Sequence, residues 1–211
     1  MCRLLLIKSE NEFDINENLK IFSKIAKNSK EFQGHGWGCS YLVNNEWEHY
    51  KNIKPIWEDD LSQFNKTKYL VAHARSAFKD KGITVENNMP FHDDKFVFIF
   101  NGELHGVRIK EEGRIGAEKI FNFIRKHDNG DIVDAFVTAI SRINRNTRYV
   151  RGMNIVLASK NHIYLNSNFG EDSDYFTVHY KETANDLHIC SESFPNQNGW
   201  RTTPNNTMMV W

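Results

Sequence analysis

The second residue of the chain is a cysteine that directly follows Met1. Methionine aminopeptidase usually removes a methionine that precedes so small a residue, so we expect the mature chain to begin with Cys2. A terminal cysteine carries a thiol and an α-amine, whose ordinary pKa values are about 8.5 and about 7.7–8.0. The amine can accept the thiol proton while the sulfur attacks an amide carbonyl. Cys2 is therefore a candidate N-terminal nucleophile, although a buried cysteine without a catalytic role is the simpler alternative.

Asn101 and Gly102 follow the apolar stretch of residues 96–100 and can complete such a reaction. Thiolate attack on an amide creates a tetrahedral oxyanion, which hydrogen-bond donors must stabilise. The side-chain amide of Asn101 and the backbone N–H of Gly102 are suitable donors, and a glycine lets the backbone approach a substrate closely. A plain β-turn after a strand is the alternative interpretation of this pair.

Arg75 comes directly after a second apolar stretch, residues 69–74. Its guanidinium presents a planar fork that suits a carboxylate, in a substrate or in a surface ion pair. His73 lies two residues earlier and so on the same face of a strand. It is more typical of a structural histidine than of a base, but we include it among the substrate-binding candidates. Gly36 and Trp37 are further candidates, because the glycine permits close approach and the indole can form either a site wall or part of the core.

Hydrophobic periodicity and turn signals predict the elements that must position these residues. We expect strands over residues 3–8, 37–43, 47–50, 69–74, 96–100, 154–158, 162–166, 175–180, 187–190 and 207–211. Asp14 should cap a helix with apolar residues at helical spacing, and further helices are expected over residues 58–64, 116–127 and 131–143. Strands early and late with two helices between them favour helices packed outside two stacked sheets.

Composition narrows the class of protein. The 211 residues fit one domain, residues 1–211. A formal net charge of +0 argues against a nucleic-acid or membrane-surface partner. No apolar run approaches the roughly 18 residues that span a bilayer. The three cysteines, Cys2, Cys39 and Cys190, fit no zinc or redox spacing, so a reducing cytoplasm is the simplest compartment and no metal or other cofactor is expected.

Four segments, in order along the chain, resemble class-II glutamine amidotransferase domains, which are N-terminal-nucleophile (Ntn) hydrolases. They are MCRLL at residues 1–5, GWGCSY at 36–41, AHARSA at 72–77 and FIFNGEL at 98–104, with a weaker match, CSES, at 190–193. The resemblance implies an α+β fold, a four-layer αββα sandwich of two mainly antiparallel sheets flanked by helices. It also implies that Cys2 is the nucleophile, that Asn101 and Gly102 form the oxyanion hole, and that Arg75 binds the substrate α-carboxylate.

The sequence departs from this family at the residue that should bind the substrate ammonium. Glutamine-using members carry an Asp-Ser pair there, and this chain has Gly116 and Ala117. Loss of one partner of a desolvated charge pair costs about 2–5 kcal/mol. The substrate therefore lacks a free α-amine, the site is inactive, or another acid replaces the aspartate. The candidate acids are Glu103, Glu111, Glu112 and Glu118. Smaller departures are His35, Phe78 and Met89, where the family commonly has Asp, Thr and His.

The resemblance implies a thiol-dependent amidohydrolase or glutamine amidotransferase. Its small-molecule substrate would be glutamine or a γ-glutamyl compound, from which ammonia or an amine is released. Because the chain ends at Trp211, we expect no synthase domain, so ammonia would be released or passed to a separate synthase subunit. Two alternatives remain open. One is an Ntn amidase that acts on a non-glutamine amide, and the other is a non-catalytic subunit that retains the fold.

Overall fold

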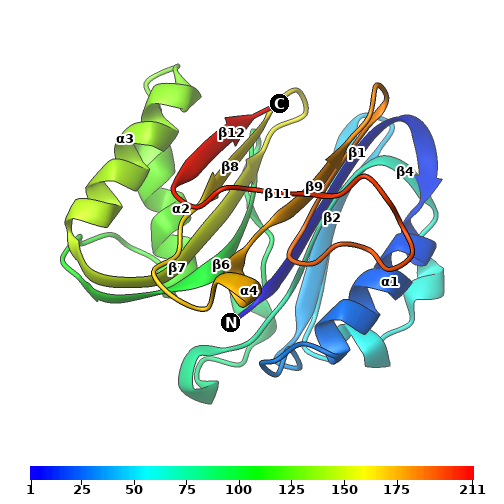
Figure 1. Cartoon of the computed structure of the whole chain (residues 1–211), viewed down its shortest axis with the longest axis horizontal. Helices are drawn as coiled ribbons and strands as arrows, with labels where there is room; N and C mark the ends of the chain where they lie inside the picture. Colours follow the sequence, from blue (N-terminus) through cyan, green and yellow to red (C-terminus); the bar gives the residue numbers. More distant parts are fainter.

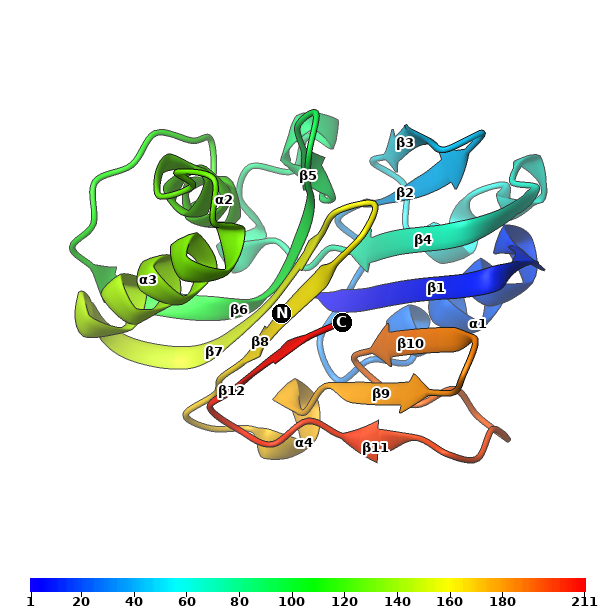
Figure 2. The same ribbon diagram turned by 90° about the horizontal axis from the view of Figure 1, so that it is seen from above.

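Two antiparallel sheets stack face to face, with helices on their outer faces (Figures 1 and 2). The computed structural model describes residues 1–211. The first sheet has seven strands in the order β11-β9-β10-β1-β4-β2-β3, and the second has five in the order β12-β8-β7-β6-β5. This architecture confirms the four-layer αββα sandwich expected from the sequence.

The strands of the first sheet are β1 (Arg3–Asp14), β2 (Trp37–Val43), β3 (Glu46–Asn52), β4 (Lys66–Ala74), β9 (His179–Glu182), β10 (Asp186–Cys190) and β11 (Arg201–Thr202). Those of the second sheet are β5 (Phe91–His92), β6 (Val97–Val107), β7 (Thr147–Ala158), β8 (Ile163–Ser167) and β12 (Thr207–Val210). Strand β1 lies between β4 and β10, so the strand that begins next to Cys2 is central in its sheet.

Helix α1 (Ile15–Lys27) covers the outer face of the first sheet, and α2 (Gly116–Lys126) and α3 (Ile132–Arg145) cover that of the second (Figure 1). Asp14 and Asp131 cap α1 and α3, because their carboxylates accept backbone hydrogen bonds from Glu17 and Asp134. Helix α2 has no side-chain cap, and its first residue is Gly116. A short fourth helix, α4 (Ser173–Phe176), precedes β9.

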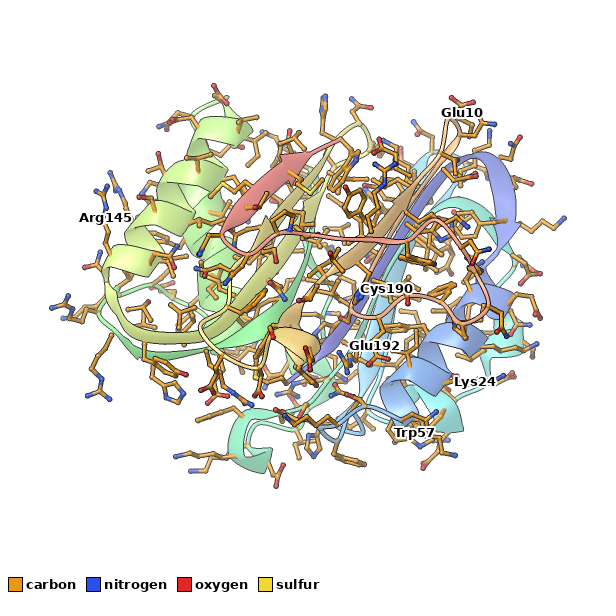
Figure 3. All side chains as sticks on the ribbon, in the orientation of Figure 1. Glu10, Lys24, Trp57, Arg145, Cys190 and Glu192 are labelled. Atoms are coloured by element: carbon orange, nitrogen blue, oxygen red, sulfur yellow. The ribbon has the colours of Figure 1, made fainter.

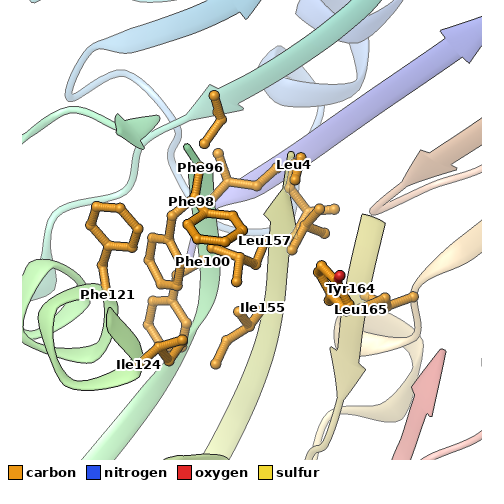
Figure 4. Packing of buried hydrophobic residues seen from close by; sticks show 14 of the residues in the cluster. Leu4, Phe96, Phe98, Phe100, Phe121, Ile124, Ile155, Leu157, Tyr164 and Leu165 are labelled. Carbon is orange, nitrogen blue, oxygen red and sulfur yellow. The ribbon is translucent and has the colours of Figure 1, made fainter. Parts of the chain in front are cut away.

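The continuous apolar run of β1 faces two cores. Leu4 and Leu6 belong to a cluster of 31 buried residues that joins the two sheets with α2 and α3. Leu5 and Ile7 point the other way, into a cluster of 17 buried residues formed with α1. Figure 4 shows Leu4 of the first sheet near Phe98 of β6 and Leu157 of β7, with Phe121 of α2 on the other side of the β6 phenylalanines. Alternate side chains of one strand thus anchor it on both faces, because successive side chains of a strand point to opposite sides of the sheet.

Two predicted elements were wrong. Residues 58–64 do not form one helix, because the chain makes two short 3₁₀ turns, Ile56–Glu58 and Leu61–Gln63, and Asp60 caps the second by accepting from the backbone of Ser62. Residues 175–180 are not one strand either, because α4 occupies the first two of them. There the Asn154 side chain donates a 2.6 Å hydrogen bond to the carbonyl of Phe176, and both Tyr175 and Phe176 are buried. Tertiary contacts override the strand preference of these aromatic residues.

No helix of the structure has the length and apolar character needed to cross a bilayer.

Candidate active site

Cys2 directly precedes β1 and is half-buried, with its sulfur against the chain that leaves β4. The backbone N–H of Ser76 donates to Sγ over 3.4 Å. Burial raises the pKa of the thiol, while the N-terminal amine, the Ser76 N–H and the charge of Arg75 act to lower it. The thiol is therefore mostly protonated at neutral pH, and a base must accept its proton before it can attack.

Polar groups gather around the peptide bond between Met1 and Cys2. The carbonyl of Met1 accepts hydrogen bonds from the Gln33 side chain and from the Tyr175 hydroxyl, and the Met1 amine pairs with Glu31. Gln33 is fully buried, and its Oε1 has no partner. Removal of Met1 would convert the Cys2 backbone nitrogen into an amine within this cluster. Sequence reasoning missed Glu31, Gln33 and Tyr175, because no motif contains them and they join the site only through the fold.

The weak match at residues 190–193 has a structural explanation. The Ser191 hydroxyl accepts a 2.9 Å hydrogen bond from the Leu4 N–H, and the Ser191 N–H donates to the Leu4 carbonyl over 3.0 Å. Glu192 pairs with the buried guanidinium of Arg3 at 2.5 Å. Figure 3 shows Cys190 and Glu192 near the start of β1. This segment therefore fixes the two residues that follow Cys2.

Arg75 is 4% exposed and has no carboxylate within ion-pair distance. Its Nη1 donates only a 3.4 Å hydrogen bond to Oδ1 of Asn88, whose own amide donates to the Asn52 carbonyl at 2.8 Å. Burial lowers the pKa of Arg75, but a guanidinium with an ordinary value above about 12 stays charged. A buried charge normally has a partner in the protein. The Arg75 guanidinium is thus a buried charge without a carboxylate partner in the protein.

Asn101 and Gly102 lie on β6, opposite Asn154 and Met153 of β7. Strand β5 pairs with β6 only at Val97 and Phe98, so no strand covers that edge of β6 at Asn101 and Gly102. Gly102 lines the cavity described below, whereas Asn101 is 1% exposed, does not line it, and has an unpartnered Oδ1. A Cβ on Gly102 would lie 2.2 Å from the Gly152 carbonyl oxygen, so only glycine fits.

His73, Gly36 and Trp37 do not line the cavity. His73 is fully buried, and its Nε2 lies 3.1 Å from the carbonyl oxygen of Phe100, which joins β4 to β6. Burial lowers its pKa to about 3, so the neutral ring donates from Nε2 to that carbonyl. Trp37 is fully buried, and its indole donates to Asp59 at 2.8 Å. These two side chains support the site from the core.

Gly36 positions Arg75 rather than contacting the cavity. Its carbonyl accepts a 2.9 Å hydrogen bond from the Arg75 backbone N–H. Its φ is +103°, and a Cβ there would lie 2.1 Å from the amide nitrogen of Asn88, the residue that contacts the guanidinium. A glycine at position 36 is therefore needed for both its backbone conformation and the packing of Asn88.

A cavity of about 700 Å³ joins these groups. Cys2, Arg75 and Gly102 line it together, so the structure brings three of the predicted site residues into one space. Of the four acids considered as replacements for the missing aspartate, Glu103 and Glu111 line the cavity, and Glu112 and Glu118 do not. Glu118 instead pairs with Arg114 at 2.5 Å. The structure contains no cluster of three or more His, Cys, Asp or Glu residues that could hold a metal ion.

Several solved structures share this fold. Glutamine phosphoribosylpyrophosphate amidotransferase from B. subtilis aligns over 99% of this chain and 47% of its own, with 12% identity and a TM-score of 0.71. A glutamine aminotransferase class-II domain protein from Silicibacter pomeroyi has 14% identity and a TM-score of 0.66, over 99% of this chain and 94% of its own. A predicted glutamine amidotransferase from Pseudomonas aeruginosa has 12% identity and a TM-score of 0.63, over 100% of this chain and 97% of its own.

The chain thus spans about half the length of the B. subtilis enzyme and nearly the full length of the other two. No curated protein sequence matches it. The family described as glutamine amidotransferases class-II matches residues 1–156, a range that includes Cys2, Arg75, Asn101 and Gly102. The chain therefore belongs to the class-II glutamine amidotransferase family.

Proposed function

We propose that residues 1–211 act as one thiol-dependent amidohydrolase of the glutamine amidotransferase type. The observation that carries the proposal is that the Cys2 thiol, the Arg75 guanidinium and the backbone of Gly102 line one cavity. A nucleophile, a carboxylate-binding group and an oxyanion donor in one space are what hydrolysis of a side-chain amide requires.

In the proposed reaction, Met1 is removed and the new α-amine of Cys2 accepts the thiol proton. Sγ attacks the side-chain amide carbon of glutamine or a γ-glutamyl compound, and a tetrahedral oxyanion forms next to Gly102 in the cavity. The Asn101 side chain, which does not line the cavity in the structure, must turn toward the oxyanion to donate to it. The C–N bond breaks, the ammonium returns the proton, and ammonia or an amine leaves. Water then hydrolyses the thioester, which yields the carboxylate and restores the thiol. Arg75 holds the substrate carboxylate throughout.

Ammonia produced in this way has two proposed destinations. It is released to solvent, or a separate synthase subunit that binds near the cavity consumes it. In the B. subtilis relative the matching region makes up 47% of a longer chain, so a domain of this fold can occur next to further protein that could consume ammonia.

Intact-protein mass spectrometry before and after incubation with a glutamine-mimicking diazoketone tests the proposal. The reagent would be used both with its free α-amine and with that amine acetylated. We expect loss of Met1 and one adduct, on Cys2, that is absent from Cys2→Ser. Retention of Met1 together with no adduct from either reagent would favour a non-catalytic subunit that retains the fold.

A further inference from the structure

We propose that the cavity binds glutamine derivatives whose α-nitrogen carries an apolar acyl group, so that the substrate class is medium-chain N-acyl-glutamine. The inference rests on the proposed function and specifies its substrate. It is carried by three features of the cavity: its size, its apolar wall and the pairing of its charges.

The cavity is too large for glutamine alone. Its volume of about 700 Å³ lies within the roughly 300–1,000 Å³ of sites that enclose drug-sized ligands. Cys2, Arg75 and Gly102 can bind the amide and the carboxylate of a substrate. Much of the remaining space would then stay empty with glutamine bound. A larger substituent would fill this space.

The remaining wall is apolar and is built largely by the end of β6, helix α2 and the segment between them. It comprises Leu104, Ile109, Ile115, Ala117, Ile120 and Phe123. Ala117, Ile120 and Phe123 are each less than 10% exposed and belong to the main core, so this wall is fixed by packing. Each methylene transferred from water to such a surface favours binding by roughly fourfold.

The carboxylates of the cavity already have partners. Glu31 and Glu103 both pair with Arg151, at 3.1 and 3.0 Å. Glu111 pairs with Lys126 at 3.4 Å. Arg151 is shared by four carboxylates, and Glu31 also holds the Met1 amine, so a substrate ammonium would have to compete with these cations for an acid of the cavity.

Most cations of the cavity, in contrast, have no carboxylate partner in the protein. Four of them line it without an ion pair to any carboxylate of the protein: Arg75, Lys79, Lys81 and Lys119. The cavity therefore favours a substrate with a carboxylate and no ammonium. Acylation of the α-nitrogen produces such a substrate, because it replaces the ammonium with a neutral amide.

Gly116 decides where the acyl chain goes. The family resemblance implies that glutamine-using members carry an aspartate for the α-ammonium at this position, and Gly116 lines the cavity. A Cβ built on it would meet no atom within 4 Å. The space beside Ile115 and Ala117 is therefore open at the position where the resemblance places the α-nitrogen of the substrate. For this reason we assign the apolar wall to a substituent on that nitrogen and not to the leaving amine.

The first test compares acyl length. Isothermal titration of Cys2→Ser with N-acetyl-, N-butanoyl- and N-octanoyl-glutamine should show affinity rising about 100-fold or more across the series. Octanoate alone and γ-glutamyl-octylamide serve as controls. Equal affinity for all three acyl-glutamines, or tighter binding of γ-glutamyl-octylamide than of N-octanoyl-glutamine, would overturn the inference.

Ammonia release by the wild-type protein separates this inference from the proposed function. Turnover that is independent of acyl length would leave the function standing and remove the inference. Length-dependent binding by Cys2→Ser, without turnover of any amide by the wild-type protein, would support the acyl pocket and overturn the proposed hydrolysis.

The second test restores an acid at position 116. Gly116→Asp fits the open space, and an acid in the first turn suits the helix dipole, so α2 should fold. We expect kcat/KM for free glutamine to rise at least about tenfold and that for N-octanoyl-glutamine to fall. Gly116→Asn has a similar shape without the charge and should show only the fall. If kcat/KM for N-octanoyl-glutamine falls in neither variant, the acyl chain does not pass Gly116, and the assignment is overturned.

Discussion

The Cys2 sulfur lies 3.4 Å from the backbone nitrogen of Ser76, the residue that follows Arg75. One short hydrogen bond thus fixes the spacing between the proposed nucleophile and the proposed carboxylate-binding group. Because Arg3 pairs with Ala74 in the register of β1 and β4, both groups emerge from the same end of two adjacent strands.

Replacement of Arg75 by alanine should lower kcat/KM by roughly 30-fold to several thousand-fold, the equivalent of about 2–5 kcal/mol. The kcat/KM of Arg75→Lys should lie between those of the wild-type protein and Arg75→Ala, because lysine retains the charge but lacks the planar fork. Steady-state kinetics with a substrate whose α-carboxylate is converted to an amide provides the control. The wild-type protein should lose activity on this substrate, and Arg75→Ala should not distinguish the two substrates.

Alkylation of Cys2 should depend on pH differently before and after Met1 removal. In the chain that retains Met1, burial raises the pKa of the thiol, so the rate with iodoacetamide should keep rising with pH beyond about 8.5. In the processed chain the adjacent amine should increase the rate near neutral pH. Cys39 and Cys190 are fully buried, so peptide mapping should locate the early adduct at Cys2. Identical pH profiles for both chains would contradict a role for the amine.

His73 should make stability fall in weak acid. Its pKa is about 3 in the folded protein and about 6.5 when unfolded, so the unfolded chain binds the extra proton between these values. The contribution of neutral His73 to the free energy of unfolding is present above pH 6.5 and is lost as the pH falls toward 3. Between pH 7 and pH 5 the loss is about 2 kcal/mol. Urea unfolding measures the free energy of unfolding at both pH values. Between them, His73→Asn should lose about 2 kcal/mol less of this free energy than the wild-type protein, and the comparison corrects for the other histidines.

Gly102→Ala should reduce both stability and activity. The new Cβ would approach the Gly152 carbonyl oxygen at 2.2 Å and the Phe100 ring at 2.5 Å, so β6 must shift where it forms the proposed oxyanion hole. Ammonia release should fall by about 10²–10³-fold. Gly116→Ala is the matched control for thermal stability, since its Cβ meets nothing within 4 Å. Equal melting temperatures for the two variants would mean that β6 tolerates the methyl group.

Gln33→Met should lower kcat by about 10- to 100-fold and leave KM within about twofold, if Gln33 positions the Cys2 amine. The near-equal volume of methionine keeps this fully buried position filled. The pH dependence of kcat should also shift, because the environment of the base changes. A proportional loss of folded protein with an unchanged pH profile would indicate a purely structural role.

Local sequence predicted the strands that flank Cys2 and Arg75 and the strand that contains Asn101, because each includes a compact apolar run next to one of these residues. The same reasoning missed β5 and β11, which contain two residues each and have no period to detect. It also missed Gln33, Tyr175 and Arg151, since their roles arise from contacts with residues far away in the sequence. It placed His73 and Trp37 near a substrate, and the structure buries both beneath the site.

Cys2 and Arg75 directly flank strands β1 and β4 of the seven-stranded sheet, and Gly102 belongs to β6 of the five-stranded one. The separation between the proposed nucleophile and the proposed oxyanion donor is therefore set by how far apart the two sheets stack. That spacing depends on the volume of the side chains between them, including Leu4, Phe98 and Leu157. Substitutions in the interior, far from any substrate, should therefore change the rate of the proposed reaction. That rate would report on how tightly the interior is packed.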